Sequence, residues 1–274
     1  MGALFGSLSA LCIGLSDLFG RRVAEASNSV ATSAAMQTLA AVTALGSVAV
    51  VSSQLAWADM VLGAVSGLGM GTGLACYYRG MTLSSSAVVA PVVATLAAVI
   101  PYGYTLITGS TPSAVAVIGA TVAFVGLVLV TLGDRAPARM RVGLTWALAS
   151  GLGYALAQTV LIETSSASGS WPGVSQRLVA LVSMMVVARV IRVPFVPPPG
   201  LRRPAVVAGI LAGFATVFFL AGVQLDAQPA VVTSSMFPAA TVAIGWVFFR
   251  DHLARVQVVG IGVVLVGITG VVSP

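Results

Sequence analysis

The chain has 274 residues, of which 58% are hydrophobic and only 7% are charged, and its mean hydropathy is +1.05. This composition excludes a soluble globular protein, because no soluble domain of this length has so little polar surface. The net charge of +6 comes from thirteen basic residues. All are arginines and most lie between apolar segments, which indicates control of membrane topology and excludes a nucleic-acid-binding role.

Ten apolar stretches each approach the length of about 20 residues that a helix needs to cross a bilayer. In chain order these predicted spans are about 2–20, 30–51, 59–78, 84–107, 113–133, 142–162, 173–191, 204–224, 229–249 and 255–273. The N-terminus lacks the basic region of a cleavable signal peptide, so the first stretch is expected to be a retained span. The connections are short, and no separate soluble domain is expected.

The arginines are concentrated in alternate connections between these predicted spans. Twelve of the thirteen fall in odd-numbered connections, the even-numbered connections contain none, and Arg177 lies inside the seventh span. By the positive-inside rule, the odd connections are cytoplasmic and both termini are outside.

The two halves of the chain repeat one pattern. Gly119 and Gly126 align with Gly260 and Gly267 at an offset of 141 residues, and Gly80 aligns with residue 222 one position out of that register. A duplicated half in a membrane protein predicts two similar bundles that face each other, with a site between them. The predicted repeats are 1–135 and 140–274.

Several stretches resemble EamA-type members of the drug/metabolite transporter superfamily. The resemblance rests on GLSDLFGRR from Gly14, on YYRGM from Tyr77 with AVVAP from Ala87, and on FP at Phe237, FFRD from Phe248 and QVVG from Gln257. It departs from the family at Ser110, where an acidic residue is common, and at Gln37, where arginine is often found.

The resemblance implies an all-α membrane fold of ten helices in two inverted five-helix repeats, with a central cavity and with spans five and ten at the periphery. It also implies transport of small metabolites, amino acids or drugs, often outward and often coupled to protons. Many members of the family have both termini inside, whereas the arginines of this chain place them outside.

Ionisable groups within spans are costly, so each is a candidate for function. Asp17 is either a proton or cation site or the partner of Arg21 one turn later. Gln158 occupies the position in span six that corresponds to Asp17. Arg177 either anchors a substrate carboxylate or phosphate or extends to the outer interface, and Gln37 is its rough counterpart in span two.

Aromatic and proline residues supply further candidates. Tyr78 and Tyr154 could line a pocket or belong to interfacial belts. Pro91, Pro101 and Pro238 are predicted inside spans, where proline frees a carbonyl group that a neighbour or ligand must satisfy. The predicted substrate-binding residues are therefore Gln37, Tyr78, Tyr154, Gln158, Arg177, Ser234 and Pro238, and Asp17 is the predicted coupling-ion site.

The remaining acidic residues have local interpretations. Glu163 is expected to be a solvated helix end, and Asp59, Asp134, Asp226 and Asp251 are expected to be turn or cap residues. The two cysteines and the one histidine form no metal-ligand spacing, so no metal is expected.

These patterns favour a secondary transporter of the inner or plasma membrane, expected to be an exporter, that works by alternating access on a small-molecule substrate. No nucleotide-binding motif and no catalytic constellation is present, so no cofactor and no enzymatic activity are expected. The alternative is a non-transporting membrane scaffold. The glycines of spans five and ten could form a homodimer face or pack only within the fold.

Overall fold

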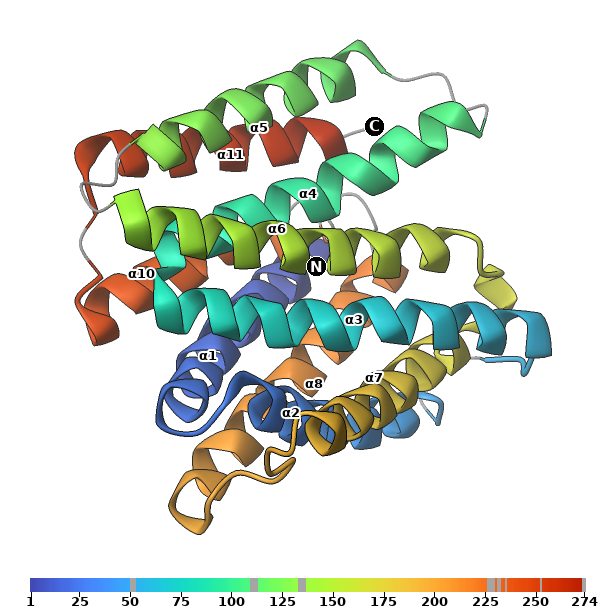
Figure 1. Ribbon diagram of the computed structural model, residues 1–274. Helices are drawn as coiled ribbons and strands as arrows, with labels where there is room; N and C mark the ends of the chain where they lie inside the picture. Colours follow the sequence, from blue (N-terminus) through green and yellow to red (C-terminus); the bar gives the residue numbers. More distant parts are fainter. Residues whose placement is uncertain are drawn as a thin grey trace.

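The chain is described by a computed structural model that covers residues 1–49, 53–108, 113–132, 137–225, 230, 233–234, 236–251 and 253–272. Within these residues it is helical and contains no strand (Figure 1). The α-helices are α1 (Gly2–Ala26), α2 (Ser29–Ser47), α3 (Trp57–Leu83), α4 (Ser86–Ile107), α5 (Ala114–Leu132), α6 (Pro137–Ile162), α7 (Trp171–Val190), α8 (Arg202–Leu225), α10 (Phe237–Phe249) and α11 (Arg255–Val272). Each predicted span overlaps one of them.

Five of the described helices are long and apolar enough to cross a membrane. They are α1, α3, α7 and the segments Arg139–Ile162 and Pro199–Phe219 of α6 and α8. Their outward faces carry large apolar side chains at helical spacing, such as Leu148, Leu152 and Leu156 on α6. Such faces suit contact with lipid, and the chain is a multi-pass membrane protein.

Local sequence explains where two of the helices begin. The side chain of Asn28 accepts a hydrogen bond from the Ala31 amide at 2.7 Å, and this cap starts α2. Helix α10 begins at Phe237, so Pro238 occupies its first turn. The amide that proline lacks would have no partner there in any case. Pro238 therefore interrupts no hydrogen bond within α10, whereas Pro91 and Pro101 lie inside α4.

The helices run back and forth across the molecule. In Figure 1 α1, α3 and α10 end toward the left, and α2 and α6 end toward the right. The arginines near the left-hand ends of α1, α3 and α10 thus share one side, called the arginine-rich side below. Helices α5 and α11 pack on each other at one end of the bundle, as expected for peripheral spans. The buried core forms around α3 and α4 and includes Tyr77, Tyr78 and Met81.

Glycine brings several helix pairs into backbone contact. A Cβ atom added to Gly67 or Gly71 of α3 would meet the backbone of α7, and one added to Gly209 of α8 would meet the backbone of α2. Small residues allow this approach, which dispersion forces then stabilise in the absence of a hydrophobic effect between helices.

The glycines of α5 and α11 face each other in the same way, since a Cβ at Gly126 or Gly267 would meet the backbone of the opposite helix. These glycine ladders therefore pack within the fold.

Serine hydroxyls join two other helix pairs. Ser9 donates to the carbonyl of Ala215 at 2.8 Å, which connects α1 to α8, and Ser150 donates to the carbonyl of Gly73 at 2.8 Å, which connects α6 to α3. The donors are 141 residues apart (150 − 9) and the acceptors are 142 apart (215 − 73). One hydrogen bond thus recurs at corresponding positions of the two halves.

Candidate functional site

Asp17 lies buried near the middle of the bundle, and side chains from two other helices hold its carboxylate. Tyr77 of α3 donates to Oδ2 at 2.8 Å and Thr241 of α10 donates to the same oxygen at 2.7 Å. Tyr78 donates to Oδ1 at 3.5 Å. The Asp17 side chain is only 6% exposed. The carboxylate is thus held by neutral hydroxyl groups that come from both halves of the chain.

The position of Tyr78 depends on Gly20 of α1. A Cβ atom at Gly20 would collide with the Tyr78 ring, so only glycine leaves room for the phenol beside α1. Tyr78 is itself fully buried, and its ring meets that of Tyr77 edge to face with centroids 5.6 Å apart. Close packing thereby fixes the two hydroxyl groups that bind Asp17.

Tyr154 of α6 extends this cluster toward α7. Its ring stands perpendicular to that of Tyr77, with 6.5 Å between the centroids. It is close enough to interact electrostatically with both Asp17 and Arg177. Tyr154 therefore packs on the aromatic cluster around Asp17 and lies within electrostatic range of Arg177.

Arg177 of α7 points into the protein and not toward the outer interface. Its Nη1 donates to Oε1 of Gln37 on α2 at 3.0 Å, and its Nη2 donates to the hydroxyl of Thr216 on α8 at 3.3 Å. Gln37 is fully buried. Gln37 and Arg177 are thus in direct contact, while their correspondence between the two halves stays a prediction.

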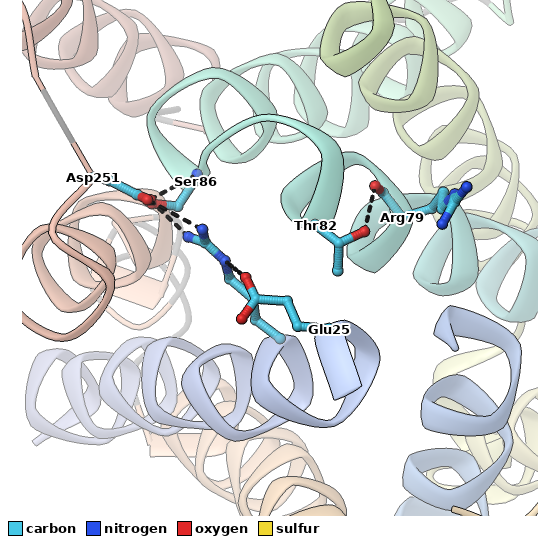
Figure 2. Close-up of polar contacts among 6 residues, drawn as sticks. Glu25, Arg79, Thr82, Ser86 and Asp251 are labelled. Carbon is cyan, nitrogen blue, oxygen red and sulfur yellow. Dashed lines mark hydrogen bonds and ion pairs between the residues drawn. The ribbon is translucent and has the colours of Figure 1, made fainter. Parts of the chain in front are cut away.

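A third cluster closes the arginine-rich side of the molecule. The guanidinium of Arg21 donates to both carboxylate oxygens of Asp251, at 2.7 and 3.1 Å, and to Glu25 at 2.9 Å (Figure 2). Asp251 also accepts hydrogen bonds from the amide and the hydroxyl of Ser86, at 3.1 and 2.7 Å, where α4 begins. The Phe249 ring lies 4.0 Å from the guanidinium carbon of Arg21. This cluster of Arg21, Asp251 and Ser86 is called the Arg21 latch below.

The backbone directs Asp251 into the latch. Arg250 ends α10 in the left-handed conformation, with φ 54°, and its amide bonds to the carbonyl of Gly245. A Cβ atom at Gly245 would collide with Ser86 and approach Asp251. Asp251, which was expected to be a turn or cap residue, is buried and caps α4, a helix far away in the sequence.

A small cavity lies between the Arg21 latch and Asp17. Its lining includes Asp17, Arg21, Met81 and Thr241, and it has room for about one water molecule. A short path of polar groups therefore leads from the buried carboxylate to the arginine-rich side.

Other acidic residues have structural roles on the opposite side or lie at the surface. Asp59, in the first turn of α3, accepts hydrogen bonds from the amide of Ser165 and the hydroxyl of Ser168 in the connection between α6 and α7. Glu163 is exposed, as predicted. Asp134, Asp226, Ser235 and the side chain of Tyr102 lie outside the described residues.

The structure brings together some of the predicted site residues and separates others. Gln37, Tyr78, Tyr154, Arg177 and Asp17 lie in the connected clusters described above. Gln158 is exposed on α6 and bonds to no other described residue. Ser234 is buried and donates to the hydroxyl of Ser9, eight residues before Asp17.

Three residues that the sequence did not single out complete the clusters, namely Thr216, Thr241 and Ser86. Their hydroxyls are common in apolar spans and carry no motif that could have identified them. The ion pair Arg21–Asp251 replaces the expected alternative Asp17–Arg21. No group of His, Cys, Asp or Glu in the described part of the chain could hold a metal ion.

Comparisons with known proteins agree with this architecture. A solved structure described only as a crystal structure of a protein shares the fold, with a TM-score of 0.59, over 96% of this chain and 98% of its own, at 19% sequence identity. No curated protein sequence matches the chain. Residues 141–273 match the EamA-like transporter family, which confirms the resemblance found in the sequence. Residues 141–273 are an EamA-like transporter domain, of the drug/metabolite transporter superfamily.

Proposed function

We propose that the protein is a secondary transporter that moves a small metabolite, an amino acid-like solute or a drug across the cell membrane, outward, by alternating access. The observation that carries this proposal is the buried Asp17, which is held between the two halves of a domain architecture of the EamA-like type. A buried carboxylate in a membrane bundle is costly and marks a solute or ion pathway.

The architecture proposed for this function is two inverted repeats of five helices, 1–135 and 140–274. Corresponding helices are α1 and α6, α2 and α7, α3 and α8, α4 and α10, and α5 and α11. Exchange of the halves converts the packed pair α1–α8 into α6–α3, and α2–α8 into α7–α3, and all four pairs are in contact. The matched serine hydrogen bonds, between α1 and α8 and between α6 and α3, support the same relation.

Alternating access requires that the halves separate on one side at a time. The Arg21 latch connects α1 to the connection between α10 and α11, and the bonds of Asp59 connect α3 to the connection between α6 and α7. Each of these contacts joins the first half to the second. In the proposed cycle the Arg21 latch opens to admit solute from the cytoplasm, to which the odd connections are assigned, and closes before the outer side opens.

Asp17 is the proposed coupling site. The groups that face it are the phenols of Tyr77 and Tyr78 and the hydroxyl of Thr241, with Tyr154 farther away and Arg21 one turn along the same helix. None of the groups that bond to it is a cation, and Arg21 is engaged by Asp251. A carboxylate without a fixed counter-ion can exchange a proton during the cycle, and the small cavity connects it to the arginine-rich side.

Transport by protein reconstituted into liposomes tests the proposal. Exchange of labelled amino acids, nucleosides, sugars, vitamins and cationic drugs is measured with and without a pH gradient. At least one solute should move faster than in protein-free liposomes. If none moves, the protein is a membrane scaffold. If Asp17→Asn keeps the dependence on the pH gradient, the coupling role is wrong while transport itself stands.

A further inference from the structure

The contacts of Gln37 leave one strong hydrogen-bond donor unused. Its Oε1 accepts from Arg177, but its Nε2 is buried and has no hydrogen-bond partner within the described part of the chain. A buried amide donor without a partner costs about 1–3 kcal/mol. Such a group in a folded protein calls for an acceptor that is absent from the protein itself.

Arg177, beside it, pairs with no anion among the described residues, where both ion pairs belong to Arg21. Arg177 bonds to the neutral oxygens of Gln37 and Thr216, and the Thr216 hydroxyl also donates to the carbonyl of Ala212 at 3.2 Å. A guanidinium has five N–H donors, so most of its capacity remains after these two bonds. A cation inside an apolar bundle is costly without a counter-charge.

The two observations point to the same kind of ligand. The site offers guanidinium N–H groups, the free amide donor of Gln37 and the nearby phenol of Tyr154, so it suits an anion with two coplanar oxygen acceptors. A carboxylate meets this requirement, because arginine binds its two oxygens side by side. A phosphate monoester, with a charge near −2, would be poorly neutralised by a single arginine.

Resting on the proposed transport function, we infer that the substrate carries a carboxylate group, and that Arg177 and Gln37 bind it. The remainder of the solute extends past Tyr154 toward Tyr77. The binding site therefore lies where α2, α7 and α8 meet, and not at Gln158.

A first test needs no knowledge of the solute. Gln37→Glu places a carboxylate of the protein next to Arg177, whereas Gln37→Met removes the amide without adding charge. Thermal unfolding of the full chain in detergent is measured for both. Gln37→Glu should unfold at a higher temperature than Gln37→Met and than the unmodified protein. An unfolding temperature at or below that of Gln37→Met would overturn the inference, because Arg177 would then need no anion.

A second test uses matched probes. The purified protein is heated with propionate, 4-methylpentanoate, phenylacetate, succinate and leucine, each beside the corresponding amide, and with glycerol phosphate. At least one carboxylate should raise the unfolding temperature where its amide does not. Arg177→Ala should weaken that effect by at least about tenfold in concentration, while Arg189→Ala, at the exposed end of the same helix, should leave it unchanged.

The outcomes separate the two proposals. Stabilisation by amides as well, by glycerol phosphate alone, or by none of the carboxylates overturns the carboxylate inference. If liposomes nevertheless exchange an uncharged or cationic solute, the transporter proposal survives that failure. If nothing in either panel binds or moves, both proposals are wrong.

Discussion

Replacing Asp251 by asparagine should weaken the Arg21 latch and shift the protein toward the state that is open on the arginine-rich side. In the native chain Oδ2 of Asp251 accepts from Arg21 and twice from Ser86, while Oδ1 accepts a second bond from Arg21 at 3.1 Å. Asparagine can keep its oxygen toward Ser86. Its NH₂ group then faces a guanidinium N–H, and both the ionic attraction and one hydrogen bond are lost.

The magnitude follows from these contacts. Breaking a buried ion pair by removing one partner costs about 3–5 kcal/mol when the remaining charge has no other partner. Arg21 retains Glu25 at 2.9 Å and the Phe249 ring, so a cost of about 2 kcal/mol to the closed state is expected. Since about 1.4 kcal/mol corresponds to a factor of ten, the closed-to-open ratio on this side should fall about thirtyfold.

Cysteine labelling measures this shift. Cys12 and Cys76 are partly exposed, so both are first replaced by alanine, and Met81→Cys is introduced. Met81 is 1% exposed and lines the cavity behind the Arg21 latch. A membrane-impermeant maleimide applied from the arginine-rich side should then label Met81→Cys many times faster in the Asp251→Asn variant.

Glu25→Gln is the matched control, because Glu25 also pairs with Arg21 but its side chain is 38% exposed. An exposed pair contributes about 0–1 kcal/mol, so labelling should change little. Equal labelling rates in folded Asp251→Asn and unmodified protein would refute the role of the latch. The same acceleration in Glu25→Gln would show that Arg21, and not its link to the second half, controls access.

Two further predictions concern packing. Gly20→Ala should displace the Tyr78 ring and destabilise the protein by about 1–3 kcal/mol. Gly262→Ala should not destabilise it, because a Cβ atom added there meets nothing within 4 Å. Thermal unfolding compares the two variants, and equal effects would contradict the packing account. Ser150→Ala removes one buried hydrogen bond and should cost about 0.5–1.5 kcal/mol in thermal unfolding, whereas Ser9→Ala also removes the acceptor of Ser234 and should cost more. Because the two serines lie in different helix pairs, the losses should add in the double variant, and a clear departure from additivity would contradict this account.

The helices are largely readable from the sequence. Apolar stretches of membrane-spanning length set the helices, and the glycines of spans five and ten marked faces that do pack closely, α5 against α11. What the sequence could not specify was which acid meets which base. Arg21 has Asp17 and Glu25 one turn away on its own helix, yet its strongest bonds go to Asp251, 230 residues later. Local spacing cannot detect a contact made by tertiary packing.

The separation of Gln158 from the other candidate residues has a geometric cause. A helix turns about 100° per residue, so Gln158 lies about 40° around α6 from Tyr154. The close contact of α6 with α3 is made by Gly153 and Ala157, and the larger Gln158 falls outside it. Arg177 and Gln37 were placed correctly in one region because their helices, α2 and α7, are packed together, although only the structure reveals that the two side chains bond to each other.

The contact between Gln37 and Arg177 also bears on how such a site can arise. In an assembly of two identical chains, helices that meet across a two-fold axis present the same residue twice, and two facing arginines would repel each other. Once both copies are encoded in a single chain, either member can be changed alone. If the two proposed repeats correspond, the glutamine–arginine pair is a contact of this kind, in which one member supplies a charge and the other a neutral amide. Covalent fusion thus makes available a polar, one-sided binding surface that an identical pair could not form.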